Sequence, residues 1–346
     1  MRILIDIAHP SHVHFFRLVI TELENRGHKT AVTIRDTNII SKLLNNFGIP
    51  YTSLTPKGTH RLLAPYRLIM RDFLLWKYCL KFRPDILVGI IAPFTPHVGF
   101  VLRKPSLIWE DTEHNKLNHR LAWPFATAIY SPDCYTLPPI KKQHLYAGCH
   151  ELAYLHPNNF TPDKETVKKL GINPDEKYCI IRLSAWMAHH DVGQHGIQQN
   201  KTLDFVKTIE KYARVYMSGE KGLPDELKKY QLNIPLHKIH HVMAFAELCI
   251  SEGATMASES AILGVPTIYI NTLKLGYINM WENYGILKQT TDTNKALEYA
   301  VDSLEDPNSK NKANTIREKM LSDKIDVKKF VIDTIENQLN SRLKAK

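Results

Sequence analysis

The sequence predicts an α/β protein with two Rossmann-like domains, each built around a parallel sheet. Three observations support this fold class. Apolar strand-like runs alternate with amphipathic helical runs along the whole chain. The length of 346 residues is suited to two cores rather than one. Residues Glu151–Asp163 hold two prolines and two asparagines with little periodicity, as in an interdomain linker.

Each predicted domain begins with a buried strand. In the first half the expected strands are Arg2–Ile7, Lys29–Arg35, Asp85–Ile91, Ser106–Glu110 and Ala128–Ser131, and a helix from His12 to Arg26 follows the first of them. In the second half the expected elements are strand Tyr178–Leu183, helix Lys201–Tyr212, strand Ala213–Ser218, helix Pro224–Lys229 and strands Leu248–Ser251 and Thr267–Asn271. We therefore expect an N-terminal domain over 1–155, a C-terminal domain over 164–325, and a helix with a tail over 326–346. Since ligands bind at the carboxyl ends of parallel strands, a ligand is expected in a cleft between the domains.

Composition predicts a cytoplasmic globular protein. The chain opens as a strand rather than a signal peptide, and no apolar run approaches the ~20 residues that span a bilayer. Five cysteines without paired spacing argue against a disulfide framework or a zinc site. No cofactor and no metal are expected.

A net charge of +10 predicts an anionic partner. Much of the excess lies in residues 57–83, where seven cations, among them Arg71, face the single acid Asp72. Apolar residues are interleaved, which predicts either an amphipathic helix in peripheral contact with an anionic membrane or a core helix with a solvated cationic face. No nucleic-acid motif accompanies the charge, so no nucleic acid is expected as a partner.

Residues 251–266 are the most informative stretch. A buried strand leads through Gly253, Ala254 and Thr255 into a short helix that carries Glu259 and ends at a Gly-Val-Pro turn. Backbone N–H groups at such a turn and helix start bind phosphate. A carboxylate one helical turn later is placed to accept hydrogen bonds from a ribose diol. The pattern predicts a nucleoside-diphosphate site, although an ordinary α/β unit with a solvated acid has the same local sequence.

Two polar clusters follow strands of the first half. His9, His12 and His14 come directly after the first strand, where an imidazole can serve as a general base, although some of them can also pack or cap the helix. The fourth strand ends in Glu110, Asp111, Glu113 and His114. These acids can orient a histidine, bind sugar hydroxyls or act as acid and base; a solvated acidic loop is the alternative.

The second half holds two more histidine-rich segments. The loop after Tyr178–Leu183 contains His190 and Asp191, and it suits a flap over a ligand better than a metal site. The run Ile239-His-His-Val is expected to mark another strand end, where His240 or His241 either meets the ligand or is an ordinary core residue.

Taken together, these motifs resemble the GT-B glycosyltransferase superfamily. The nearest likeness is to a bacterial and archaeal family, the domain of unknown function 354. It is carried by Asp6-Ile-x-His-Pro-x-His-Val-His-Phe-Phe, Asp111-Thr-Glu-His, Trp186-x-Ala-x-His-Asp-x-Gly and Gly253-Ala-Thr-Met-Ala-Ser-Glu. The 251–266 segment is also similar to the donor motif of the N-acetylglucosaminyltransferase that makes lipid II. In that likeness Glu259 would hold the ribose, and Gly253, Ala254 and Thr255 the diphosphate.

The same resemblance assigns the catalytic base. In the lipid II enzyme the candidate base is a histidine fifteen residues before the glycine that ends the first helix, and His12 stands fifteen residues before Gly27. The glycine-rich turn of that enzyme is replaced here by Ala8-His-Pro-Ser. The UDP-N-acetylglucosamine 2-epimerases share the fold and use acidic cleft residues, which Glu110, Asp111 and Glu113 match.

We therefore expect a metal-independent glycosyltransferase with a nucleotide sugar as donor, uridine-linked by preference. The expected acceptor is a cell-surface glycan or a lipid-linked molecule, and the expected location is cytoplasmic or peripheral at the inner membrane face. His12 is the expected base, with Asp111 or Glu113 as its orienting partner, and His241 a further donor-site candidate. A sugar-nucleotide epimerase and a binding protein without chemistry are the alternatives.

Overall fold

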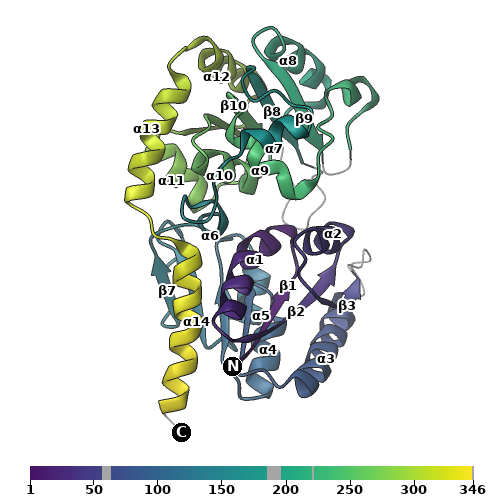
Figure 1. The fold of residues 1–346 in the computed structure, drawn as a ribbon, viewed down its shortest axis with the longest axis vertical. Helices are drawn as coiled ribbons and strands as arrows, with labels where there is room; N and C mark the ends of the chain where they lie inside the picture. The colour runs from purple at the N-terminus through teal and green to yellow at the C-terminus, as the bar shows by residue number, and fades with distance from the viewer. Residues whose placement is uncertain (57–63, 185–195, 220–221, 345–346) are drawn as a thin grey trace. The chain divides into compact units, whose positions relative to one another are not determined.

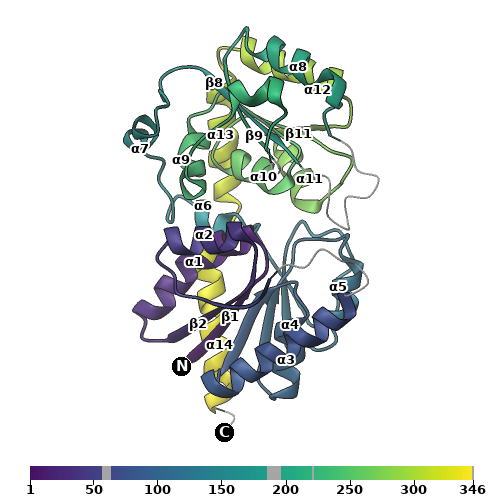
Figure 2. The ribbon, with the colours of Figure 1, turned by 90° about the vertical axis from the view of Figure 1, so that its right-hand side faces the viewer.

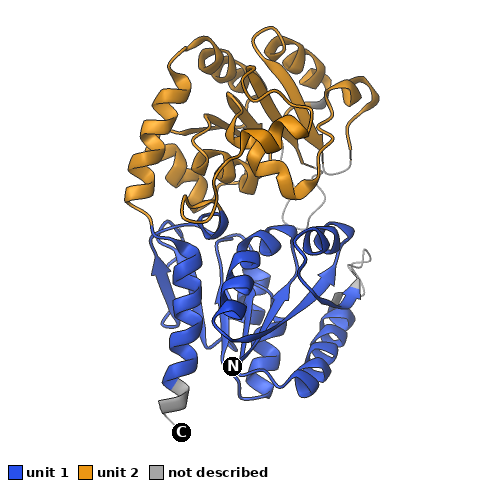
Figure 3. Cartoon of the chain, viewed as in Figure 1, with its two compact units in different colours: residues 1–154, 325–346 blue, residues 155–324 orange. Residues whose placement is uncertain are grey.

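The chain folds into two compact units, which Figure 3 colours separately. In the computed structural model, residues 1–56, 64–184, 196–219 and 222–344 are described. Unit 1 comprises Met1–Tyr154 with Ile325–Lys346, and unit 2 comprises Leu155–Lys324. The segment 326–346, which the sequence set apart as a helix and tail, therefore belongs to unit 1.

Unit 1 is built on a seven-stranded parallel sheet in the order β3-β2-β1-β4-β5-β6-β7. Its strands are β1 (Arg2–Ile7), β2 (Lys29–Asp36), β3 (Thr52–Pro56), β4 (Ile86–Ile90), β5 (Ser106–Trp109), β6 (Ala128–Pro132) and β7 (Gln143–Tyr146). The central strands are buried on both faces, since every residue of β4 and β5 is buried. Continuous apolar runs of this kind are what a doubly covered parallel sheet requires.

Helices cover this sheet. They are α1 (Pro10–Asn25), α2 (Asn38–Asn46), α3 (Ala64–Phe82), α4 (Phe94–Val101), α5 (Lys116–Ala122) and α14 (Val327–Lys344), with α6 (Leu152–Leu155) at the boundary of the units. The C-terminal helix α14 packs along α1 (Figure 1) and buries Val331, Ile335 and Leu339 at helical spacing. Arg26 also donates to Glu336 at 2.9 Å. These contacts tie the two ends of the chain together.

A buried ion pair joins α3 to the middle of the unit 1 sheet. Arg71 is 1% exposed, and its Nη2 donates to Oδ1 of Asp6 on β1 at 2.6 Å. Its Nη1 donates to the carbonyl oxygen of Ile34 and to Thr55, both at 3.0 Å. The expectation that the cations of residues 57–83 lie on an exposed face is therefore wrong for Arg71. Asp72 is also paired: its Oδ2 lies 2.8 Å from Nδ1 of His97.

Unit 2 has a five-stranded parallel sheet in the order β12-β11-β10-β8-β9. Its elements are β8 (Tyr178–Leu183), β9 (Arg214–Gly219), β10 (Leu248–Ser251), β11 (Thr267–Ile270), β12 (Leu287–Thr290), α7 (Lys164–Lys169), α8 (Thr202–Ile209), α9 (Ile239–Ala244), α10 (Ala254–Ile262), α11 (Gly276–Tyr284), α12 (Thr293–Glu305) and α13 (Ser309–Ser322). Short 3-10 turns cover Gln199–Lys201, Asp225–Tyr230 and Leu236–Lys238. The expected helix at Pro224–Lys229 is thus a 3-10 turn.

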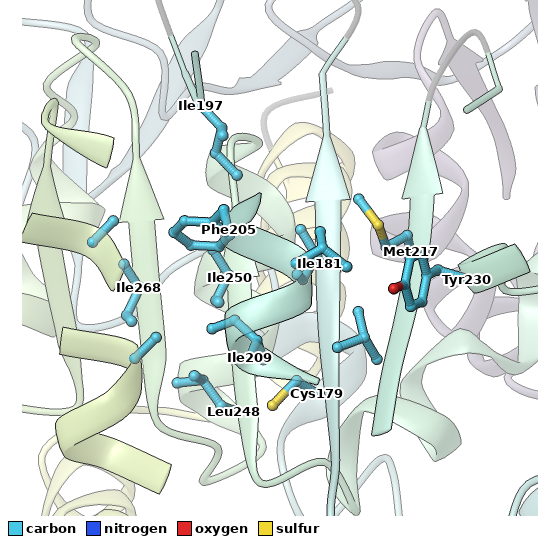
Figure 4. Close-up of a cluster of buried hydrophobic side chains, with 14 of the residues drawn as sticks. Cys179, Ile181, Ile197, Phe205, Ile209, Met217, Tyr230, Leu248, Ile250 and Ile268 are labelled. Atoms are coloured by element: carbon cyan, nitrogen blue, oxygen red, sulfur yellow. The ribbon is translucent and has the colours of Figure 1, made fainter. Parts of the chain in front are cut away.

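The core of unit 2 forms where α8 crosses its sheet. Figure 4 shows Phe205 of α8 beside Ile250 and Ile181, which come from the neighbouring strands β10 and β8. All three side chains are at most 2% exposed. This apolar layer fixes the position of the middle strands. The loops that follow these strands therefore start from fixed points.

The strands that the sequence did not predict are all edge strands. β3 and β7 are the two edges of the unit 1 sheet, and β12 is one edge of the unit 2 sheet. Edge strands are short and carry polar residues, because one side lacks a pairing partner. In contrast, the predicted bounds of β1, β8 and β10 are confirmed to the residue.

Replacing Arg71 by Met is expected to destabilise the protein by about 3–5 kcal/mol. The change leaves the Asp6 carboxylate buried without its cation. Urea unfolding followed by circular dichroism measures the loss. Lys77→Met, at an exposed position of the same helix, is the matched control and should shift stability by no more than about 0.5 kcal/mol. Equal effects of the two changes would show that the ion pair does not stabilise the fold.

Candidate active site

Titratable residues of unit 1 gather at the carboxyl edge of its sheet. His12 follows β1, Asp111 follows β5, and His150 follows β7. All seven strands of this sheet are parallel, so these distant positions reach the same edge. This is where ligands of open α/β sheets bind.

Asp111 and His150 form an ion pair at this edge. Oδ2 of Asp111 lies 2.9 Å from Nδ1 of His150, and both side chains are largely buried. Burial alone would raise the pKa of Asp111, but the His150 cation outweighs it and lowers this pKa to about 2. Burial likewise opposes protonation of His150, yet Asp111 raises its pKa above the ordinary value. Each shift therefore favours the charged form of its group.

The pair links stability to pH in two directions. The pKa of Asp111 is lower in the folded protein, so its contribution is present above pH ~4 and is lost as the pH falls toward 2. The pKa of His150 is higher in the folded protein, so its contribution is present below pH ~6.5 and is lost as the pH rises through the folded value. Sequence reasoning missed His150, because no local pattern connects it to Asp111.

His12 is neutral at physiological pH. Burial is the main cause of its lowered pKa, followed by the charges of His9 and His150, while Asp111 opposes them. The backbone N–H of Ala8 approaches Nδ1 at 3.4 Å, the outer limit of a hydrogen bond. A neutral imidazole at the end of β1 is suited to take up a proton.

The other two predicted histidines of this segment, His9 and His14, make different contacts. His9 is exposed and caps α1, since its Nδ1 accepts from the backbone N–H of Ser11 at 3.3 Å. His14 is buried between the rings of Phe47 and Tyr154, at centroid distances of 5.8 and 5.3 Å. The ring of His9 stays near that of His12, at a centroid distance of 5.8 Å, and the charges of Asp111 and His150 act on His12.

The remaining acids of this edge differ in environment. Glu110 is fully buried; burial raises its pKa well above the ordinary value, and Asp111 adds to the rise. Its Oε1 accepts from the N–H of Thr112 at 2.7 Å, and its Oε2 lies 3.6 Å from His119. Burial, then Asp111, raises the pKa of Glu151 to about 7. The pKa values of Asp111 and Glu110 are thus shifted in opposite directions, toward the ionised form of Asp111 and the protonated form of Glu110.

Glu113 and His114 lie in the connection between β5 and α5. Oε1 of Glu113 accepts from the N–H and the hydroxyl of Thr136, each at 3.3 Å. This contact fixes the segment between β6 and β7. His114 is half-buried in the same connection. The sequence predicts that Asp111 or Glu113 orients His12. In the structure, the histidine that Asp111 contacts is His150.

In unit 2, the predicted phosphate-binding turn begins a helix without a side-chain cap. Gly253 is the N-cap residue of α10 and makes no side-chain cap hydrogen bond, and the first turn carries no acid. Gly253, Ala254 and Thr255 are half-buried. Uncapped N–H groups at a helix start are donors for an anion. The helix ends at Ile262, and Gly264 follows with a φ of +79°, as the Gly-Val-Pro stop predicted.

Glu259, one turn further along α10, pairs with His240. Its Oε1 lies 2.9 Å from Nε2 of His240, and both side chains are at most 10% exposed. The contact holds the Glu259 carboxylate in one orientation. The expectation that 239–242 end a strand is wrong, because these residues begin α9. His241 lies on another side of that helix, where its Nδ1 accepts from the N–H of Asp163 at 3.1 Å.

Glu252 is a further residue that sequence reasoning missed. Its buried carboxylate accepts from the N–H groups of Ser184, at 2.6 Å, and Ile197, at 2.8 Å. A Cβ on Gly196 would come within 2.2 Å of Oε1, so only glycine fits there. An acid directly after the buried strand β10 was the available signal. The predicted His190 and Asp191 lie outside the described residues.

Among the described residues, no group of three or more histidine, cysteine or acidic side chains has an arrangement that could hold a metal ion. Likewise, no described helix combines the length and the apolar character needed to span a bilayer.

A family model described as "Protein of unknown function (DUF354)" matches residues 1–339. The chain belongs to this family. The uncharacterized protein MJ0665 of Methanocaldococcus jannaschii is 24% identical over 287 residues, which cover 76% of this chain and 80% of that protein. That match is to a relative without a stated activity.

Solved structures show the fold of this DUF354 member. The UDP-GlcNAc 2-epimerase of Neisseria meningitidis bound to UDP-GlcNAc superposes with a TM-score of 0.68 at 14% identity, covering 97% of this chain and 100% of that one. The spinosyn forosaminyltransferase SpnP does so with a TM-score of 0.66 at 13% identity, covering 98% and 99%. The fold is GT-B, and it is shared by transferases and epimerases.

We expect His12 and His150 to titrate on opposite sides of the ordinary histidine range. His12 should stay neutral at pH 6.5, because burial disfavours its cation, and His150 should stay protonated, because Asp111 stabilises its cation. NMR of the imidazole carbons, assigned with His12→Asn and His150→Asn, measures both midpoints.

Asp111→Asn should lower the midpoint of His150, whereas Asp133→Asn, at an exposed position of unit 1, is the control and should leave it in place. A His150 midpoint below that of His12 would contradict the proposed charge state of the site.

Proposed function

We propose that this protein is a glycosyltransferase that takes a sugar from a nucleoside-diphosphate donor, with a uridine nucleotide preferred. The observation that carries the proposal is in unit 2. An uncapped helix start at Gly253 is followed, one turn later, by the Glu259 carboxylate, which His240 holds in place. The fold shared with a protein solved with UDP-GlcNAc supports the same reading.

The donor half follows from the chemistry of these groups. N–H groups of the first turn of α10 would bind the diphosphate, and their dipoles would stabilise the charge that develops on it as it leaves. Glu259 would accept hydrogen bonds from the two ribose hydroxyls. His241 contacts Asp163 and the ring of Phe160. We therefore place it at the margin of the proposed donor site.

The acceptor half assigns the base to His12. The acceptor hydroxyl gives its proton to His12 while its oxygen bonds to the anomeric carbon of the sugar. The bond from that carbon to the diphosphate breaks, and the nucleoside diphosphate leaves with the electron pair. The base role needs Nε2 without a hydrogen, and the 3.4 Å contact at Nδ1 opposes that tautomer only weakly. Asp111 would stabilise the imidazolium through its charge, since it raises the pKa of His12.

A sugar-nucleotide epimerase is the second candidate. In its favour, the pKa of Glu110 is raised and that of the adjacent Asp111 is lowered, because neighbouring carboxyl groups with separated pKa values can act as acid and base. Epimerisation at C2 needs no acceptor and exchanges the C2 proton with solvent. NMR of UDP-N-acetylglucosamine incubated with the protein in deuterated water separates the two reactions. A binding protein would show neither exchange nor transfer.

Contact with an anionic membrane through α3 stays a prediction. Tyr66, Ile69, Phe73 and Leu80 of this helix are 48–67% exposed, at spacings that place them on one face. Lys77 and Lys81 are exposed on the same helix. Exposed apolar side chains flanked by lysines are typical of helices that lie on anionic lipid. Residues 57–63 of the predicted basic segment lie outside the described residues.

Glu259→Gln is expected to weaken UDP binding by about 1.5–3 kcal/mol, or roughly 10- to 150-fold, because the amide loses the charged acceptor for the ribose. Isothermal titration calorimetry measures the change. Glu298→Gln, at an exposed position of unit 2, is the control and should bind UDP as the wild type does. UDP binding of Glu259→Gln within twofold of the wild type would refute the donor-site assignment.

For the membrane contact, we expect sedimentation with vesicles that contain phosphatidylglycerol and none with neutral vesicles, because the lysines need anionic lipid. The double change Ile69→Glu and Phe73→Glu should abolish it. The control pair Tyr212→Glu and Leu236→Glu, at two exposed large apolar positions in the described part of unit 2, should not. Retention of binding by the α3 pair would exclude α3 as the contact.

A further inference from the structure

An open cavity of about 590 Å³ lies at the surface of unit 1, between α5 and the segment that leads into β7. This volume is in the range of small-molecule sites. The position of α5 is seen in Figure 2. The cavity belongs to neither of the two sites described above.

Much of the cavity wall is apolar. Trp123, Pro124 and Ile140 contribute to it, and the ring of Trp123 stacks on that of His119 at a centroid distance of 4.3 Å. The aliphatic stems of lysine and arginine side chains also cover apolar surface while their charged ends stay in water. A wall of this composition is suited to a hydrocarbon chain.

The charged residues that line the cavity are cations. They are Lys116, Arg120, Lys141 and Lys142. Among the residues that the structure describes, no carboxylate forms an ion pair with any of the four. Lys142 donates only to the carbonyl oxygens of Pro124 and Ala126, both at 3.0 Å. Four neighbouring cations without a counter-charge favour the binding of an anion.

One side chain connects the cavity with the acids at the sheet edge. His119 lines the cavity, and its Nε2 lies 3.6 Å from Oε2 of Glu110 and 3.4 Å from the hydroxyl of Tyr135. Burial lowers the pKa of His119 to about 4, so this ring is not a fifth cation. A ligand in the cavity is thus separated from Glu110 by one imidazole ring.

We propose that the cavity binds an amphiphilic organic phosphate: an apolar chain against Trp123 and Ile140, and a phosphate held by the cations of the rim. A phosphate fits better than a carboxylate, because its oxygens can engage several cations at once. If the transfer function proposed above holds, this ligand belongs to the acceptor, and the inference of an acceptor class rests on that function. The binding site itself rests on the cavity.

The test measures binding of octyl phosphate to the full chain by isothermal titration calorimetry. Octanol, octanoate and inorganic phosphate are the comparators. We expect octyl phosphate to bind at least tenfold more tightly than each of them. If octanol binds as tightly as octyl phosphate, the cations have no role. If octanoate binds as tightly, the choice of headgroup is wrong. If inorganic phosphate binds as tightly, the apolar wall has no role.

Two variants locate the site. Arg120→Gln with Lys141→Gln should weaken octyl phosphate binding at least tenfold and leave octanol binding unchanged. Both positions are exposed, so folding should be preserved. The control pair Lys77→Gln and Lys81→Gln removes the same charge from α3 of the same unit and should keep wild-type binding. An equal loss in both pairs would show non-specific attraction by net charge and overturn the site.

Titration of UDP on the same samples separates this inference from the donor assignment. Glu259→Gln should lose UDP binding and keep octyl phosphate binding, because the two sites belong to different units. If the protein binds octyl phosphate but not UDP, the assignment of the cavity holds and that of the donor site is refuted. UDP binding without octyl phosphate binding would refute the cavity alone.

Discussion

Within each unit all strands run parallel, and both candidate sites depend on this constraint. Parallel strands end at the same edge of a sheet, so residues that follow them meet although the chain between them is long. Asp111 follows β5 and His150 follows β7, yet their side chains are 2.9 Å apart. In unit 2 the same rule brings Glu252, after β10, to the N–H of Ser184, after β8.

The parallel edge of unit 1 concentrates acids, and burial together with the His150 contact shifts their pKa values in different directions. Glu110, Asp111 and Glu151 are all buried or nearly so. Several carboxylates in one poorly solvated region cannot all be charged. Burial is the main cause of the raised pKa values of Glu110 and Glu151, and Asp111 adds to both. The contact with His150 instead lowers the pKa of Asp111. Since the pKa of Glu151 lies at about 7, this carboxyl group can exchange a proton near neutral pH.

Local features were predictable from the sequence, and pairings across the fold were not. Gly253 and Glu259 were found because strand, turn and helix lie in one short segment. His240 was not recognised as the partner of Glu259, because the four residues Ile239-His-His-Val do not distinguish a strand end from a helix. The period of the element decides which of two adjacent histidines turns inward. Arg71 was assigned to a cationic rim for a related reason: amphipathic patterning places charges outward, and only the fold shows that Asp6 lies beneath α3.

The GT-B fold by itself does not decide between transfer and epimerisation, because proteins of both kinds share it. What separates the two reactions physically is the number of substrates. An epimerase acts on one sugar nucleotide, and it would need only the proposed donor site and the candidate acid–base pair Glu110–Asp111. A transferase must also hold an acceptor, and unit 1 holds a cation-lined cavity one side chain away from Glu110. A second, chemically different binding site beside the acids is required by transfer and superfluous for epimerisation. Occupation of that cavity by an organic phosphate therefore bears on the choice of reaction more directly than the likeness of the fold.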